Sequence, residues 1–246
     1  MTGERNLNGV DRYAREVTER LWPGSEVVIQ PMGSRSTTKG TYTILTPDPD
    51  TPFAVVKFAI PPEYLAVDDP EQVHLHTVEE INREANTIEN LKRDIKERAS
   101  DLESQAARTP SIWVPQMYTR SEDAFAREWV SGKHILNTAD LRLDEAMLYV
   151  SDVVTITEGL GYAGFKALAM NGKQPHVGDE GSIETTLFRH YSPYVEAPVL
   201  SPLEFQSVRD VSDPTFKGLQ EEDLVQATWL VRLARGLLPE YDVQDE

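Results

Sequence analysis

The sequence predicts an α+β fold of two lobes, with an amino-terminal antiparallel sheet plus a long helix and a mainly helical carboxy-terminal lobe. Short runs rich in Val, Ile, Tyr and Phe, separated by turn residues, indicate strands in the first half of the chain. A long helical pattern follows three of these strands, and two more helical patterns lie in the second half. Ser131-Gly132-Lys133 interrupts the pattern, so we place the lobes at residues 1–130 and 131–246.

The first predicted helix runs from about Val10 to Trp22, because apolar residues recur there on one helical face. Pro23-Gly24 ends it. The next three apolar runs are separated by a polar loop and a Pro-Asp turn, which is typical of neighbouring antiparallel strands. These strands are expected at residues 27–29, 41–45 and 53–58.

A long helix is predicted from Thr77 to Ala107. Thr77 and Glu80 form a capping box, in which each side chain satisfies a free backbone N–H at the helix start. Such a helix is longer than a compact lobe needs, so we expect it either to break near Ser100 or to extend its far half as a coiled arm. Packing against the protein's own sheet is favoured over a partner-binding coiled coil.

The remaining elements are shorter. Strands are expected at residues 112–114 and 124–130, and helices at 144–160 and 221–238. Residues 161–220, between these helices, are rich in Gly and Pro and are expected to form short strands.

Composition excludes several classes of function. The 246 residues include no cysteine, which excludes disulfides, thiolate catalysis and Cys-based metal sites. A net charge of −17 repels phosphates unless basic residues cluster, so no nucleic-acid partner is expected. Without a spanning apolar run or a secretory signal pattern, we expect a cytoplasmic protein with no membrane contact. The acidity is typical of proteins of halophilic archaea and also of acidic proteins of mesophiles.

Several residues of the first lobe suit a nucleotide. The loop between the first two strands contains Gly33, Ser34, Ser36 and Thr37, whose small size and hydroxyls let the backbone approach a triphosphate. Lys57 lies near the end of an apolar strand, and an inward-facing lysine there needs an anion.

The anion that Lys57 needs is either a phosphate or the carboxylate of Glu84 on the long helix. Residues Glu128 to Val130 lead into a glycine-containing crossover that offers backbone donors and acceptors to an adenine ring. Asp179, which lies between glycines, is a candidate magnesium ligand or general base. His74 and His76 alternate without an evident third ligand, so no metal site is expected there.

In this order, these motifs resemble the protein-kinase-like superfamily, nearest to its aminoglycoside or choline phosphotransferase branch and its atypical kinase branch. The resemblance covers roughly residues 28–185. It implies a two-lobed kinase-like fold that binds ATP and Mg²⁺. It also implies that Lys57, held by Glu84, contacts the phosphates, and that Asp179 holds magnesium or orients the acceptor hydroxyl.

The chain departs from the family in lacking an H-R-D or H-G-D sequence followed by Asn. In one register, Asp179-Glu180-Gly181 replaces the D-F-G element and residues 161–169 cover a catalytic loop without an aspartate. That register implies a nucleotide-binding pseudokinase.

In the other register, His176 and Asp179 stand for the H-x-D element, Glu184 takes the Asn position as a metal ligand, and Glu196 is a second ligand. That register implies a divergent phosphotransferase acting on a small acceptor. The competing hypothesis is a non-enzymatic interaction or scaffold protein that binds a protein partner through its long helix.

Overall fold

The structure is a computed structural model, and it describes residues 9–24, 27–31, 38–39, 41–45, 52–64, 74–104, 110–130, 132–134, 141–165, 168–169, 184–185, 187–190, 199–202 and 205–236. The chain divides into two compact units. Unit 1 comprises Met1–Glu89 and Pro115–Val130, and unit 2 comprises Asn90–Val114 and Ser131–Glu246.

Unit 1 is built on an antiparallel sheet of five strands in the order β1-β3-β4-β7-β6. The central strand β4 pairs on one side with β3 and on the other with β7, so that Val56 lies opposite both Tyr42 and Ala126. A separate short parallel pair joins β2 to β5. The strands are β1 (Val28–Pro31), β2 (Thr38–Lys39), β3 (Thr41–Leu45), β4 (Pro52–Phe58), β5 (His74–Leu75), β6 (Met117–Arg120) and β7 (Ala124–Glu128).

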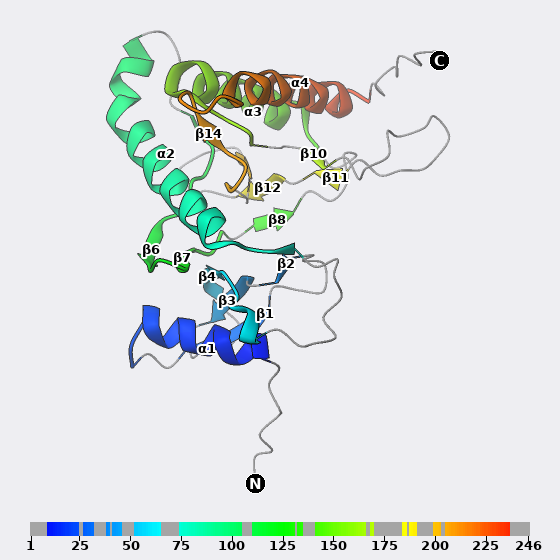
Figure 1. Cartoon of the computed structure of the whole chain (residues 1–246). Coiled ribbons are helices and arrows are strands. Elements are labelled where there is room, and N and C mark those ends of the chain that lie inside the picture. Colours follow the sequence, from blue (N-terminus) through cyan, green and yellow to red (C-terminus); the bar gives the residue numbers. More distant parts are fainter. Residues whose placement is uncertain are drawn as a thin grey trace, which may run out of the picture. The chain divides into compact units, whose positions relative to one another are not determined.

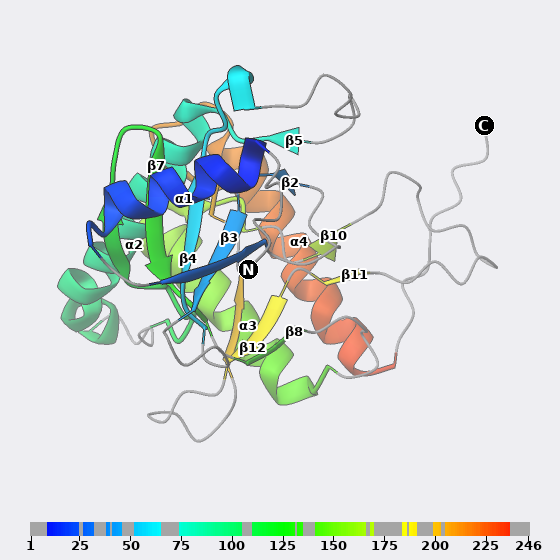
Figure 2. The ribbon, with the colours of Figure 1, turned by 90° about the horizontal axis from the view of Figure 1, so that it is seen from below.

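Helix α1 (Gly9–Leu21) covers one face of this sheet (Figures 1 and 2). Its apolar stripe of Tyr13, Ala14 and Val17 packs in one core with alternate residues of the strands, because side chains of a strand point to opposite faces in turn. Tyr13 also donates a hydrogen bond of 2.6 Å to Asp123 in the β6–β7 turn. The short 3₁₀ helix η1 (Pro62–Tyr64) adds Tyr64, whose ring lies 4.6 Å from that of Tyr13.

Helix α2 (Val78–Ser104) begins with the predicted capping box. The Thr77 hydroxyl accepts a bond of 3.1 Å from the Glu80 N–H, and the Glu80 carboxylate accepts one of 2.9 Å from the Thr77 N–H. The helix continues through Ser100, so the expected break there is wrong. In unit 2, the Tyr162 hydroxyl donates a bond of 2.6 Å to Asp94, so the far half of α2 packs on its own chain.

In unit 2, the helices α3 (Leu143–Val154) and α4 (Phe216–Ala234) lie side by side (Figure 1). A π-helical turn, Thr155–Leu160, continues α3 and ends at Gly161, which has a positive φ of 76°. The described strands are β8 (Gly132–His134), β9 (Tyr162–Ala163), β10 (Leu168–Ala169), β11 (Glu184–Thr185), β12 (Leu187–His190), β13 (Val199–Pro202) and β14 (Arg209–Asp210). They form the sheets β13-β12-β8, β10-β11 and β14-β9.

The predicted α+β class is confirmed, with an antiparallel sheet and long helix early in the chain and helices later. Two further details are wrong. Residues 112–114 form no strand, and the edge strand is β6 instead. The last helix begins at Phe216 and ends at Ala234, not at residues 221 and 238. None of the helices in the described part of the chain has the length and apolarity that crossing a bilayer requires.

Candidate functional site

A buried ion pair joins the sheet of unit 1 to helix α2. The Lys57 ammonium donates to both carboxylate oxygens of Glu84, at 2.8 Å to Oε1 and 3.0 Å to Oε2. The two side chains are 6% and 1% exposed. Lysine and glutamate are almost never buried to this extent unless they are paired. The structure therefore brings together the two residues that the sequence placed at the centre of the site.

The alternation of β4 explains why Lys57 faces α2. Ala54, Val56 and Phe58 point into the core shared with α1. Val55 and Lys57 consequently point to the opposite face, and both are buried there. A lysine in this apolar run therefore lies against a helix and away from water.

A set of polar contacts fixes α2 against the sheet and so holds Glu84 in position. The Asn82 amide donates 2.6 Å to the Glu122 carbonyl in the β6–β7 turn. The guanidinium of Arg120, on β6, donates hydrogen bonds to three side-chain oxygens of the helix. They are those of Asn86 at 2.8 Å, Glu89 at 3.0 Å and Asn82 at 3.1 Å. The planar guanidinium matches several acceptors along one helix face, which restricts both rotation and sliding of the helix.

The segment predicted to contact adenine is bonded within unit 1. The Glu128 N–H donates 2.8 Å to the Gln116 carbonyl, and the Glu128 carboxylate accepts 3.0 Å from the Gln116 N–H. The Trp129 N–H donates 2.9 Å to the Phe53 carbonyl, and Val130 is buried at 6% exposure. These contacts fix where the chain leaves β7. The adenine contacts of Glu128 and Val130 stay predictions.

The other predicted site residues fall outside what the structure describes. Gly33, Ser34, Ser36 and Thr37 precede β2, and Asp179 precedes β11, in undescribed segments. Glu184 begins β11, but its side chain is likewise outside the description, as is Glu196. The expectation that Asp179 and Lys57 look into one crevice therefore stays a prediction.

Unit 2 contains a buried carboxylate that the sequence analysis missed. Asp223, on α4, is 4% exposed and accepts backbone N–H bonds from Gly164 at 2.6 Å and Phe165 at 3.0 Å. Burial raises the pKa of the Tyr149 phenol, and the charges of Asp223 and Asp152 raise it further. Asp223 lies on the same face of the helix as the buried residues Ala227 and Leu230. An acidic residue at an apolar position of a helix was therefore the sequence signal for a buried carboxylate.

Asp223 holds the turn that follows β9. Gly164 has a φ of 101°, and the Ser207 hydroxyl donates 2.7 Å to its carbonyl. β9 pairs with β14, so that Tyr162 lies opposite Asp210. The segment between these two strands, which includes Asp179, therefore starts and ends at neighbouring points of unit 2.

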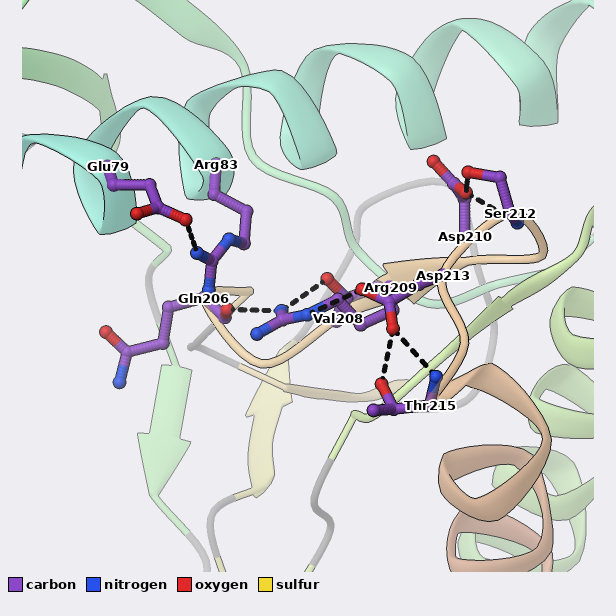
Figure 3. Close-up of polar contacts among 9 residues, drawn as sticks. All are labelled: Glu79, Arg83, Gln206, Val208, Arg209, Asp210, Ser212, Asp213 and Thr215. Carbon is purple, nitrogen blue, oxygen red and sulfur yellow. Dashed lines mark hydrogen bonds and ion pairs between the residues drawn. The ribbon is translucent and has the colours of Figure 1, made fainter.

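A second missed carboxylate, Asp210, ends β14. Its Oδ1 accepts 2.8 Å from the Ser212 N–H and also contacts the Ser212 hydroxyl (Figure 3). The Asp213 carboxylate accepts a hydrogen bond of 2.8 Å from the Thr215 N–H, and its other oxygen lies 3.4 Å from Arg209 Nε. Among the described residues, no group of three His, Asp or Glu side chains is arranged to hold a metal ion.

No protein-family model matches the sequence, and no curated protein matches it. Two similar solved structures are of Rio2 kinase from Chaetomium thermophilum. One, the complex with ADP/Mg²⁺-phosphoaspartate, is 12% identical over 96% of this chain, with a TM-score of 0.43. The other is 7% identical over 99% of this chain and 70% of that one, with a TM-score of 0.48. The chain spans 64% of the length of the first. Neither similarity assigns a role to a residue of this chain.

Proposed function

We propose that this chain binds a nucleotide as a kinase-like protein, with Lys57 contacting the phosphates and Glu84 holding Lys57. The buried Lys57–Glu84 pair carries the proposal. A buried ion pair is weak evidence for stability alone, because apolar residues of similar size often serve as well. A site that must orient an ammonium toward a phosphate gives such a pair a reason to exist.

Magnesium binding by carboxylates of unit 2 would require phosphate oxygens as further ligands. Mg²⁺ binds through one or two carboxylates plus phosphate oxygens, so a cluster of three acids is not required. Asp179 stays the candidate ligand, and the bound metal would neutralise phosphate charge.

Binding is tested by thermal unfolding with and without Mg-ATP, at low and high salt. A ligand at 100 times its Kd stabilises the folded state by ~2.7 kcal/mol, which raises the melting temperature measurably. The Lys57→Met/Glu84→Leu double variant is expected to fold and to lose this shift. Lys96→Met, at an exposed position on α2, is the matched control and keeps it. A shift that survives in the double variant would refute the role of Lys57.

ATP turnover distinguishes a divergent phosphotransferase with a small acceptor from a degraded enzyme that only binds. Asp179→Asn is compared with wild type, with the exposed Asp101→Asn as control. Loss of turnover in Asp179→Asn alone would support an essential role for this carboxylate. Binding without turnover in wild type supports the pseudokinase. No thermal shift at any salt concentration would leave the non-enzymatic interaction protein as the better description.

A further inference from the structure

His76 is a buried histidine that contacts the strand next to Lys57. Its Nε2 is 3.3 Å from the Thr41 hydroxyl, and the imidazole is 5% exposed. Thr41, on β3, is the direct cross-strand partner of Lys57 on β4. Directly opposed residues of antiparallel strands share a face, with Cβ atoms about 5 Å apart. His76, Thr41 and Lys57 therefore follow one another on the α2 side of the sheet.

Backbone pairing places the same histidine next to the strand that follows the predicted phosphate loop. β5 ends one residue before His76 and runs parallel to β2, with Thr38 opposite His74 and Lys39 opposite Leu75. Thr38 directly follows Gly33 to Thr37, the loop that the sequence predicts to approach a triphosphate. The chain leaving this loop thus runs alongside the chain that enters His76.

The charges on this face suit an anion. Arg127, on β7, is paired with Val55 and so shares the face of Lys57, and it is 5% exposed. Among the described residues, the charged groups on this face include Lys57 from β4, Arg127 from β7 and Glu84 from α2, while β3 contributes neutral threonines. Two cationic side chains therefore lie on one face of a chain whose total charge is −17. A protonated imidazole would add a third cation, and it donates from both ring nitrogens.

We propose that His76, together with Thr41, is a phosphate-binding part of the Lys57 site, and that protonation of His76 strengthens binding of a nucleoside diphosphate. This inference rests on the proposed function. His76 supplies one donor to a phosphate oxygen, and Thr41 holds the imidazole toward it. An ordinary core histidine would have no reason to respond to a ligand.

The test measures Mg-ADP and adenosine binding by calorimetry at about pH 5.5 and about pH 8, on either side of the usual histidine pKa. Wild type is compared with His76→Gln and Thr41→Val, and His134→Gln on β8 is the matched control. Because ADP itself titrates in this range, the difference between proteins is the readout. Loss of one charge-assisted bond is expected to weaken Mg-ADP binding about tenfold at the lower pH and much less at the higher pH. Adenosine binding should be unchanged.

Equal pH profiles for Mg-ADP in wild type and His76→Gln would overturn the role of His76 while leaving the proposed function intact. Failure of wild type to bind any nucleotide would instead refute the proposed function. Should the variants unfold, the His76 ring resonance of wild type is titrated by NMR with and without Mg-ADP. Its pKa is expected to rise when Mg-ADP is bound, and an unchanged titration would overturn the inference.

Discussion

Removing one partner of the Lys57–Glu84 pair should destabilise unit 1 strongly. The ammonium lies 2.8 and 3.0 Å from the two carboxylate oxygens, and both side chains are almost fully buried. At ~3 Å and an effective dielectric constant of ~20, the attraction is roughly 5–6 kcal/mol, largely offset by the cost of removing both charges from water. Glu84→Leu leaves the ammonium buried without its counter-charge, for which the expected cost is about 3–5 kcal/mol.

The double variant Lys57→Met/Glu84→Leu should recover most of this loss. It replaces both charges with apolar side chains of similar length, and such replacements are often neutral. Because each single substitution leaves a buried charge unpaired while the double leaves none, the coupling energy in a double-mutant cycle should be at least about 3 kcal/mol, measured from urea unfolding curves.

Glu79→Leu is the matched control, because Glu79 pairs with Arg83 on the same helix but is 82% exposed (Figure 3). Its expected cost is only ~0.5 kcal/mol. If the single substitutions proved additive, or if Glu84→Leu cost no more than Glu79→Leu, the reasoning about the buried pair would be refuted.

Three further substitutions test contacts elsewhere in the two units. Burial favours a higher pKa for Asp123, but hydrogen bonds from Tyr13, Arg20 and Ser121 outweigh it and lower the pKa, so this stabilisation is present above about pH 4 and lost in stronger acid. The difference in the free energy of unfolding between wild type and Asp123→Asn should therefore disappear in stronger acid, as measured by urea unfolding at a series of pH values. Burial and Asp123 raise the pKa of Tyr13 to about 12, so its contribution is lost as the pH rises from about 10, and Tyr13→Phe should flatten alkaline unfolding. Gly164→Ala should lower the melting temperature, since a Cβ there lies 2.5 Å from the Ser207 carbonyl oxygen, whereas Gly218→Ala in open helical space should raise it.

The helices and central strands were predictable because their signals are local. α1 was predicted within one residue at each end, from apolar spacing and the following Pro-Gly. β3 was predicted with its observed bounds, and the capping box placed the start of α2. The pairing of Lys57 with Glu84 followed from one general rule, that a charge on a buried strand needs a partner.

The edge strand was mispredicted because apolar content was taken as a sign of pairing. Ile112 and Val114 are buried but belong to a segment that pairs with no strand. Met117–Arg120 alternates between half-buried and exposed residues, as an edge strand does, and pairs with β7. The turn residues Ser121 to Asp123 that connect the two strands were the better signal.

The ends of α4 are marked in the sequence by Asp213 and Gly236, which affect a helix only when they lie next to its first or last turn. Asp213 accepts the Thr215 N–H before the first turn, which is how an Asx turn starts a helix. Gly236, with a φ of 71°, follows the last turn and donates to the Leu233 carbonyl. Asp223 could not be assigned its role from the sequence, because its partners are backbone amides some 60 residues away in the chain.

The net negative charge of the chain opposes binding of nucleic acid much more strongly than binding of a single nucleotide. Surface charges act through water and salt, and beyond ~10 Å they are largely screened. A duplex lies along an extended surface and therefore meets that repulsion over many phosphates. A nucleotide is small enough for its phosphates to lie against a few buried groups, where the effective dielectric is lower and each charge counts for more. The proposed phosphate contact of Lys57 is therefore compatible with a total charge of −17.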